Sequence, residues 1–169
     1  GTYLREQPTD HLKIVPTHFA ALAQVVGSAA LMPRVGLVLG GEAASTALLQ
    51  SIFSAAEKRG TEVHNHYGPT ETTIGVVTCS LSEHAGDPYP PLGRPAPNVR
   101  CSIVRDGELV PPGVVGELCI AGPQVADGYL NQPELTGQRF VPDLFGDSAT
   151  IMYRTGDRAC WMRDGTRSP

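Results

Sequence analysis

The spacing of apolar residues in the first half of the chain predicts that strands alternate with helices. Leu12 to Thr17 (LKIVPT) is a short apolar run, which predicts a buried strand that ends at Pro16. We expect Thr17 to cap the helix that follows. The apolar positions of that helix recur at helical spacing and are Phe19, Leu22, Ala23 and Val26.

A second strand and helix follow at once. Val35 to Gly41 (VGLVLGG) is almost wholly apolar, which is typical of a strand covered on both faces. Ser45 to Arg59 has a helical period, and Gly60 stands where a helix commonly ends in a left-handed residue. The apolar positions of this helix are Leu48, Leu49, Ile52, Phe53 and Ala56. With EVHNHY and GVVTCSL as two further strands, residues 1–86 are predicted to be α/β.

The second half of the chain has a different character. Five prolines between Pro88 and Pro97 disfavour regular structure, so residues 87–97 are predicted to be a connection. The segment VRCSIVRDGELV has two alternating runs joined at Asp106-Gly107, a strong hairpin signal. GELCIAG predicts another strand, and only Pro133 to Phe140 has a helical period. Residues 98–169 are therefore predicted to form a small, mostly antiparallel β unit, distorted and barrel-like.

Composition narrows the function classes. The chain has 169 residues and 41% hydrophobic content, which is enough for a core. Its formal charge of −4 and the lack of any Lys or Arg run argue against nucleic acid as a partner. Four widely spaced cysteines without a CxxC pair argue against zinc and favour a reduced, cytoplasmic location. No apolar run reaches membrane-spanning length, so we expect no membrane partner.

The stretch HNHYGPTETT, residues 64–73, concentrates several kinds of chemistry. Gly68-Pro69 forces a turn after a strand, at the carboxyl edge where α/β sheets bind ligands. Tyr67 offers a ring face to an aromatic base, Thr70 a hydroxyl to a phosphate, and Glu71 an oxygen ligand to Mg²⁺. A strand and turn capped by Thr70 and Glu71, with Tyr67 half-buried, fits these residues equally well.

A family resemblance favours the first interpretation. HYGPTE resembles the nucleotide-binding motif of adenylate-forming enzymes, in the form found in nonribosomal peptide synthetase adenylation domains. VGELCIAGPQVADGYL, NQPELTGQRFVPDLF and YRTGDRACW resemble further family motifs in the same order, and LVLGGEA stands where the family has its loop beside adenine. The resemblance covers almost the whole chain. It implies a partial adenylate-forming (acetyl-CoA synthetase-like) fold, namely a fragment of the large N-terminal subdomain.

The resemblance implies roles in ATP binding. Tyr67 would stack on adenine, and Asn65 would belong to the same nucleotide-binding motif. Thr70 would contact the α-phosphate, Glu71 would bind Mg²⁺, and Asp157 would accept hydrogen bonds from both ribose hydroxyls. The loop that lines the base would contribute Gly41, Glu42 and Ala43.

Some of these residues have simpler interpretations. Without the resemblance, Asp157 is a surface residue of a Thr-Gly-Asp turn. For Glu117, a glutamate in a strand, and Tyr129, an aromatic residue after a glycine, we expect scaffold roles in the β unit and assign no chemistry.

The resemblance also suggests an amino-acid pocket, whose positions would be Lys13, Val38, Gly40, His66, Ile74 and Gly75. Lys13 would pair with a side-chain carboxylate and His66 would donate a second hydrogen bond, while the glycines leave room. This set resembles that of aspartate-activating domains, so aspartate or a 3-methyl or 3-hydroxy derivative is expected. Asparagine-activating domains tend to carry an acid where His66 stands. Taken alone, Lys13 is a solvated lysine and His66 a satisfied polar residue.

Several parts of the family pattern are missing from this sequence. These are the upstream phosphate loop, the aspartate that grips the substrate amino group, and the C-terminal subdomain with its catalytic lysine. We therefore expect a piece of a longer enzyme that is inactive alone and that passes its product to the phosphopantetheine of a peptidyl carrier domain, an expectation by analogy. A non-catalytic remnant or interaction module is the first alternative. An acyl-CoA ligase is the second, and the YGPTE form and the pocket residues argue against it.

Overall fold

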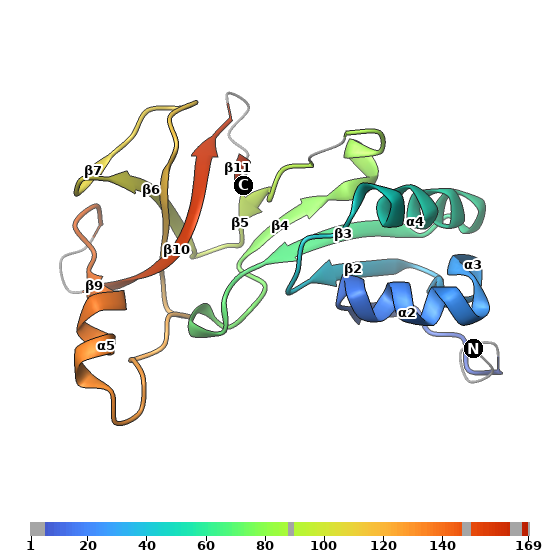
Figure 1. The fold of residues 1–169 in the computed structure, drawn as a ribbon, viewed down its shortest axis with the longest axis horizontal. Helices are drawn as coiled ribbons and strands as arrows, with labels where there is room; N and C mark the ends of the chain where they lie inside the picture. Colours follow the sequence, from blue (N-terminus) through green and yellow to red (C-terminus); the bar gives the residue numbers. More distant parts are fainter. Residues whose placement is uncertain (1–5, 88–89, 147–149, 163–166, 169) are drawn as a thin grey trace. The chain divides into compact units, whose positions relative to one another are not determined.

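The computed structural model describes residues 6–87, 90–146, 150–162 and 167–168, and these form two compact units (Figure 1). Unit 1 comprises Gly1–His66 and Cys79–Pro90, and unit 2 comprises Tyr67–Thr78 and Pro91–Pro169. Pro88, one of the five prolines of the expected connection, lies outside the described residues. None of the helices in the described part of the chain is long and apolar enough to cross a membrane.

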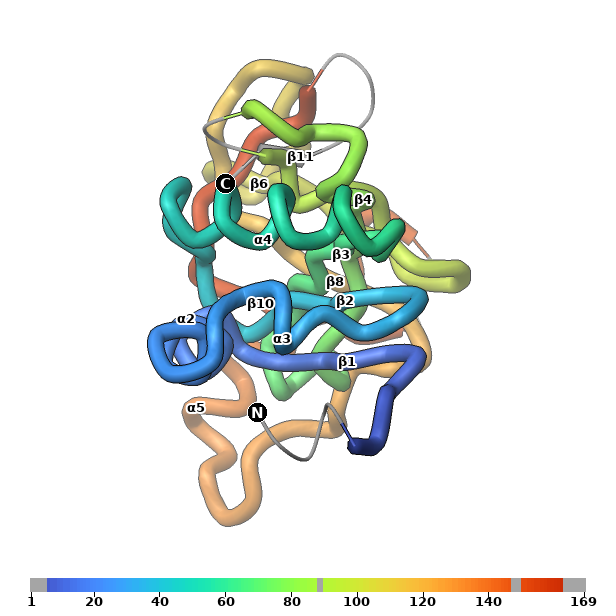
Figure 2. Tube along the Cα trace, turned by 90° about the vertical axis from the view of Figure 1, so that its right-hand side faces the viewer, coloured from blue at the N-terminus to red at the C-terminus, as the bar shows by residue number. Residues whose placement is uncertain are grey.

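Unit 1 is built on three parallel strands with helices between them. The strands are β1 (His11–Ile14), β2 (Gly36–Gly40) and β3 (Glu62–Tyr67), and they lie side by side in that order (Figure 2). The helices are α2 (Pro16–Val26), α3 (Ser28–Leu31) and α4 (Thr46–Arg59). Strand β4 (Val77–Ser80) is antiparallel to β5 (Arg94–Pro95), and a short 3₁₀ turn, η2 (Leu81–His84), follows β4.

Strand alternation gives this sheet two different faces. Leu37, Leu39 and Val63 are at most 1% exposed and form one cluster with residues of all three helices. Phe19 of α2 and Ile52 of α4 are fully buried in the same cluster. The helices therefore cover the face that carries the leucines, and residues at the alternate positions of β1, β2 and β3 point to the opposite face.

The α/β prediction for this part is confirmed, with three differences. The first strand ends at Ile14 and not at Pro16, which is already the first residue of α2. Helix α2 begins at Pro16 with Val15 as its N-cap, so the predicted cap at Thr17 is wrong. Proline is favoured in the first turn of a helix, because the N–H that it lacks has no partner there, and the helix can start before Thr17. Gly60 ends α4 with φ 75°, as expected. Val38 is only half-buried, so the helices bury one face of β2 and not both.

Unit 2 contains the antiparallel sheet predicted for the second half. Its strands are β6 (Arg100–Arg105), β7 (Glu108–Leu109), β8 (Gly116–Ala121), β9 (Phe140–Pro142), β10 (Ile151–Trp161) and β11 (Arg167–Ser168), and the helix α5 (Pro133–Arg139) precedes β9. The order is β11-β10-β8-β6-β7, with β9 against β10. Asp106 and Gly107 have φ of 54° and 83° and turn the chain between β6 and β7, so the predicted hairpin is confirmed. The core holds Ile103, Leu118 and Ile120, each at 0% exposure.

Residues 67–78 belong to unit 2, although the sequence places them within the α/β part. The Ala126 N–H donates to the Glu71 carbonyl at 2.8 Å, and the Thr73 hydroxyl donates to the Gln124 carbonyl at 2.8 Å. Val77 is fully buried in the same cluster as Leu118. Both bonds tie this stretch to the loop before Gly128, which explains the assignment. The division of the whole domain at residues 86 and 97 stays a prediction.

The turn after β3 generates a stability prediction. A Cβ atom on Gly68 would lie 1.5 Å from the Ile74 carbonyl oxygen, a backbone atom that cannot rotate away. We expect Gly68→Ala to destabilise the protein by at least about 2 kcal/mol. Gly137, inside α5, has no atom within 4 Å of such a Cβ, so Gly137→Ala should be neutral or stabilising by roughly 0.5–1 kcal/mol. Urea unfolding measures both, and equal stability of the two variants would contradict the prediction.

Candidate functional site

Tyr67 and Asp157, which are 90 residues apart in the sequence, are in direct contact in unit 2. The Tyr67 hydroxyl donates a hydrogen bond to Asp157 Oδ2. The Tyr67 ring is partly buried against the cluster that contains Val76 and Ile120. Burial, together with the bond to the Asp157 carboxylate, raises the pKa of Tyr67, so the phenol stays protonated. The structure therefore brings together the residues expected at the base and at the ribose.

Asp157 is placed by a turn that interrupts β10. The register of β10 against β8 shifts between Arg154 and Arg158, and Gly156 has φ 81°. The Asp157 N–H donates to Thr155 Oγ1 at 3.0 Å, and Asp157 itself is exposed. The bulge takes the carboxylate out of the strand ladder and leaves it open to a ligand.

Glu117, for which the sequence suggested only a scaffold role, holds this turn. Its Oε1 accepts the Gly156 N–H at 3.1 Å. Its Oε2 accepts from Arg154 Nη2 at 2.6 Å and Nε at 3.1 Å. The Glu117 carboxylate therefore satisfies a backbone N–H of the turn that carries Asp157.

Glu71 lies in the short 3₁₀ turn η1 (Thr70–Thr72) and is half-buried. The Tyr129 hydroxyl donates to Glu71 Oε1 at 2.6 Å, and this bond is the main cause that lowers the pKa of Glu71. The carboxylate is therefore ionised at neutral pH. Mg²⁺ is usually held in nucleotide sites by one or two carboxylates together with phosphate oxygens, so a single partly exposed Glu71 fits such an ion. Thr70, at the start of the same turn, is exposed.

Arg139 was not singled out from the sequence, although it lies in the QRF stretch of a family-like motif. Its Nη1 donates to the Arg154 carbonyl at 3.4 Å and lies 3.1 Å from the place of a Cβ on Gly156. Its charge also helps to lower the pKa of Glu71. One guanidinium thus lies near both the Asp157 turn and the Glu71 carboxylate.

Unit 1 contains four of the six expected pocket residues, and they share one face of the sheet. Lys13 pairs in register with Val38, and Gly40 pairs with His66. Because side chains two residues apart in a strand point the same way, all four lie on the face opposite the helices. Lys13 is exposed. A Cβ on Gly40 would lie 2.7 Å from the His66 carbonyl oxygen, so this position requires glycine.

This face carries the basic groups Lys13, His64 and His66 together with the Glu62 carboxylate. Burial lowers the pKa of His66, and the Lys13 ammonium and the His64 imidazole lower it further. Lys13 and His66 therefore lie close enough to repel each other when both are charged. His64, which the sequence did not single out, lies on the same face and is 3.3 Å from Glu62 Oε2 through its Nε2.

The remaining expected residues are split between the units. Gly41, Glu42 and Ala43 form an exposed loop at the carboxyl end of β2. Asn65 is next to Leu39 in register, so it lies on the face opposite His66. Ile74 and Gly75 belong to unit 2, and Ile74 has φ 70° and is 49% exposed. A positive φ is unusual for a branched residue, and such strain is common at functional sites.

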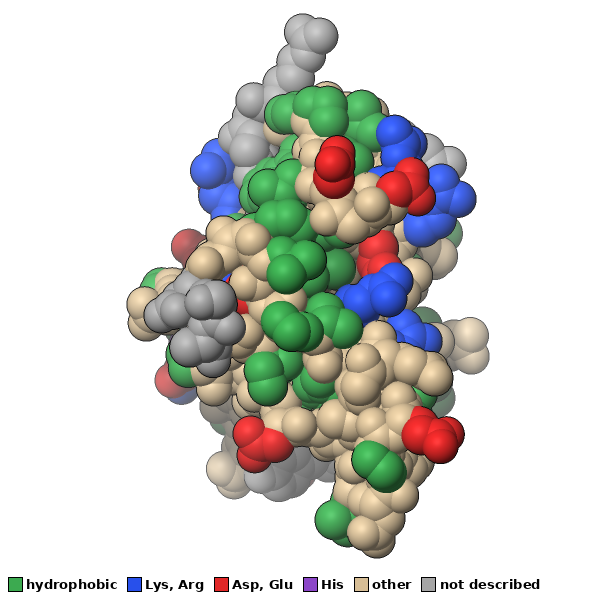
Figure 3. All heavy atoms as spheres, turned by 90° about the vertical axis from the view of Figure 1, so that its left-hand side faces the viewer, with side chains coloured by type: hydrophobic (Ala, Val, Ile, Leu, Met, Phe, Trp, Pro, Cys, Tyr) green, Lys and Arg blue, Asp and Glu red, His purple; other side chains and the backbone are tan. Residues whose placement is uncertain are grey.

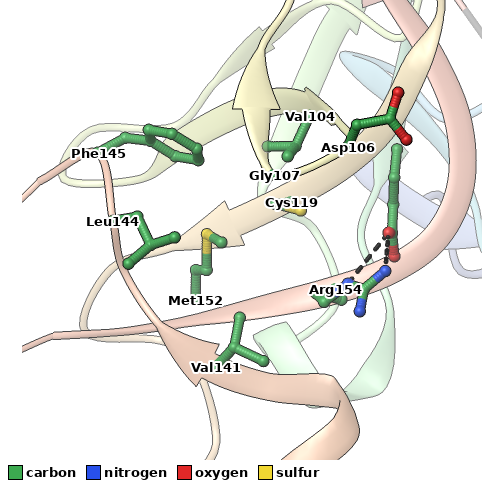
Figure 4. Close-up of a pocket in the computed structure, with 10 residues that line it drawn as sticks. Val104, Asp106, Gly107, Cys119, Val141, Leu144, Phe145, Met152 and Arg154 are labelled. Atoms are coloured by element: carbon green, nitrogen blue, oxygen red, sulfur yellow. Dashed lines mark hydrogen bonds and ion pairs between the residues drawn. The ribbon is translucent and has the colours of Figure 1, made fainter.

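Unit 2 also has a pocket of about 450 Å³, which lies apart from the expected nucleotide and substrate residues (Figure 4). Val141, Leu144 and Met152 give apolar side chains to its wall, and Arg154, which forms an ion pair with Glu117, lies at one side. Cys119 also lines it, and burial raises the pKa of this thiol to about 12. Figure 3 shows a band of apolar side chains on the side of the molecule that carries α5 and β9. None of the expected nucleotide or substrate residues lines the pocket.

The fold and these residues define a class of protein. An α/β unit with glycine-rich turns after its strands, followed by an antiparallel β unit, is the expected partial adenylate-forming fold, and this fold class is confirmed. The family described as AMP-binding enzyme matches residues 2–130. The chain therefore belongs to the AMP-binding enzyme family.

Known proteins similar to this chain include two much longer synthetases. A dimodular nonribosomal peptide synthase of Bacillus subtilis is 41% identical over 156 residues, covering 92% of this chain and 6% of the relative. Phosphinothricin tripeptide synthetase PhsB of Streptomyces viridochromogenes is 41% identical over 167 residues, covering 98% of this chain and 14% of the relative. The chain thus spans a small part of the length of these relatives.

A solved structure, the N-terminal subdomain of Klebsiella oxytoca NpsA, is similar in fold. It aligns with a TM-score of 0.82 and 24% identity, over 99% of this chain and 41% of that chain.

The Glu117 contacts generate a prediction about the Asp157 turn. Glu117→Ala removes the acceptor of the Gly156 N–H, so amide exchange at residues 155–157 should become roughly ten-fold faster. Glu117→Gln keeps an oxygen at this position and should change exchange much less. Hydrogen–deuterium exchange measures both variants. Unchanged exchange in Glu117→Ala would show that this carboxylate does not hold the turn.

Proposed function

We propose that the chain is part of a nonribosomal peptide synthetase adenylation domain, which activates an amino acid with ATP and loads it on a carrier protein. The observation that carries the proposal is the contact of Tyr67 with Asp157 in the unit that also contains Glu71. Family membership and the names of the two relatives support the same reaction class.

In this proposal each residue of unit 2 has one task. Tyr67 offers the face of its ring to adenine, and its hydroxyl orients Asp157, whose carboxylate accepts hydrogen bonds from the ribose hydroxyls. Thr70 donates to an α-phosphate oxygen, and Glu71 holds Mg²⁺. When bound, Mg²⁺ offsets phosphate charge while a substrate carboxylate oxygen bonds to the α-phosphorus and the bond to pyrophosphate breaks.

The proposed nucleotide contacts of unit 1 come from the end of β2 and from β3. The exposed loop Gly41–Ala43 lines the base, with Glu42 beside it, and Asn65 completes the motif. The aminoacyl group then passes from the adenylate to the phosphopantetheine thiol of a carrier domain in the cytoplasm.

The proposed substrate is L-aspartate or a 3-substituted aspartate. Lys13 and His66 lie on one sheet face, and burial, together with the nearby Lys13 ammonium, lowers the pKa of His66. An anionic side chain would relieve this repulsion by pairing with Lys13 and accepting a hydrogen bond from His66. Val38 and Ile74 would wall the pocket, and Gly40 and Gly75 would leave room for the guest.

Substrate choice is tested in the full-length protein that contains this segment. We expect aspartate to support ATP–pyrophosphate exchange, and asparagine and leucine not to. Lys13→Met should lower kcat/KM for aspartate by about 100-fold, because a carboxylate would then be desolvated without its partner. Lys58→Met, which changes the other lysine in the exposed last turn of α4, is the matched control and should have no effect. A Lys13→Met enzyme that still prefers aspartate would refute the assignment.

Free coenzyme A in place of the carrier distinguishes an acyl-CoA ligase, for which the free thiol would be the better acceptor. A full-length protein that neither exchanges pyrophosphate nor binds ATP would favour the non-catalytic alternative.

The isolated 169-residue segment gives a second prediction. The family resemblance places the phosphate loop and a catalytic lysine outside the motifs of this sequence, so the segment alone should show no exchange above background. The full-length protein in the same assay is the positive control. Robust turnover by the segment would contradict the prediction.

A further inference from the structure

The Tyr129 hydroxyl forms a short hydrogen bond with the Glu71 carboxylate, a contact that the sequence did not predict. It donates to Glu71 Oε1 at 2.6 Å, a length typical of a charge-assisted bond to a carboxylate. Resting on the proposed function of Glu71, we propose that Tyr129 is a positioning residue, which orients the Glu71 carboxylate for the Mg²⁺ of the bound nucleotide.

The Tyr129 backbone is fixed from both sides by Thr136. The Tyr129 N–H donates to Thr136 Oγ1 at 2.9 Å, and the Thr136 hydroxyl returns a 3.5 Å bond to the Tyr129 carbonyl. A Cβ on Gly128 would lie 2.4 Å from Thr136 Cγ2, so only glycine allows this close approach. The side chain of Tyr129 therefore starts from a well-defined position.

The Tyr129 ring is also held by aromatic neighbours. It meets Phe140 edge-on with 5.3 Å between ring centroids, and Phe140 in turn lies 5.1 Å from Tyr153. The hydroxyls of Tyr129 and Tyr153 are 3.3 Å apart, and Tyr153 is only 5% exposed. These contacts fix the direction from which the phenol approaches Glu71.

The hydroxyl does more than tie two loops together, because backbone bonds already do so. The Ala126 N–H donates to the Glu71 carbonyl at 2.8 Å, and Thr73 Oγ1 donates to the Gln124 carbonyl at 2.8 Å. What these bonds leave free is rotation of the Glu71 side chain. Tyr129 restricts that rotation by binding one carboxylate oxygen, which is the usual way in which outer groups orient a metal ligand.

The full-length protein is tested with Mn²⁺ as the probe, titrated in the presence of ATP and followed by electron paramagnetic resonance. Tyr129→Phe keeps the ring and removes the hydroxyl, and we expect it to weaken Mn²⁺ binding by about ten-fold. The Mg²⁺ concentration for half-maximal pyrophosphate exchange should rise by a similar factor. Saturating Mg²⁺ should restore kcat, which it would not do if the change only damaged the fold.

Two further variants separate the possible causes. Tyr153→Phe leaves the Tyr129 bond to Glu71 in place and removes a hydroxyl whose contribution to lowering the pKa of Glu71 is weaker than that of Tyr129, so its effect should be smaller than that of Tyr129→Phe. Unchanged Mn²⁺ binding in Tyr129→Phe, an effect of equal size in Tyr153→Phe, or a loss of exchange that Mg²⁺ does not restore would each overturn the inference.

Glu71→Gln tests the proposed metal ligand itself. If it leaves Mn²⁺ binding unchanged, the metal assignment of the proposed function fails, and the inference fails with it. If Glu71→Gln weakens binding and Tyr129→Phe does not, the inference alone fails.

Discussion

The alternation of side chains along three parallel strands is the constraint on which unit 1 depends. The positions of Leu37, Leu39 and Val63 face the helices and are almost fully buried. The strand register then puts Lys13 and His66 on the other face of the sheet. A one-residue slip of β1 would send Lys13 into the helix-covered core, where an unpaired ammonium is costly. Burial of the leucines therefore fixes where the charged residues lie.

In unit 2 the positions of the acidic residues are set by contacts with neighbouring side chains and not by strand register. Asp157 stands in a bulge of β10, where the ladder is interrupted, and Glu71 lies in a 3₁₀ turn. Neither position follows from a regular period. Glu117 binds the backbone beside Asp157, and Tyr129 binds the Glu71 carboxylate. Contacts with neighbouring side chains thus limit the freedom of both acids, and the Tyr67 hydroxyl binds the Asp157 carboxylate directly.

Much of the fold could be predicted because its signals are local. The alternating runs around Asp106-Gly107 gave the hairpin, and the helical period that stops at Gly60 gave α4. The predicted cap at Thr17 was wrong because the proline before it allows an earlier helix start. Residues 67–78 were placed with the α/β part because their partners, such as Ala126, are some fifty residues away in the sequence.

The same difference separates the candidate site residues that the sequence predicted from the neighbours that only the structure revealed. Tyr67, Glu71 and Asp157 belong to motifs for which the family resemblance implies a contact with ATP, and so they could be recognised one by one. Tyr129 and Arg139 also lie in family-like segments, but what they do depends on their contacts with Glu71 and Arg154, and contacts over long separations have no period or spacing in the chain.

From the sequence alone, Tyr129 after Gly128 has only a structural role, because its partner Glu71 is known only from the structure. Scaffold and site are not separate here, since the 2.6 Å bond that packs Tyr129 into unit 2 is also the bond that sets the direction of the Glu71 carboxylate. If Glu71 holds the metal ion, then Tyr129, with Gly128 and Thr136 behind it, serves to place the Glu71 carboxylate as well as to pack unit 2.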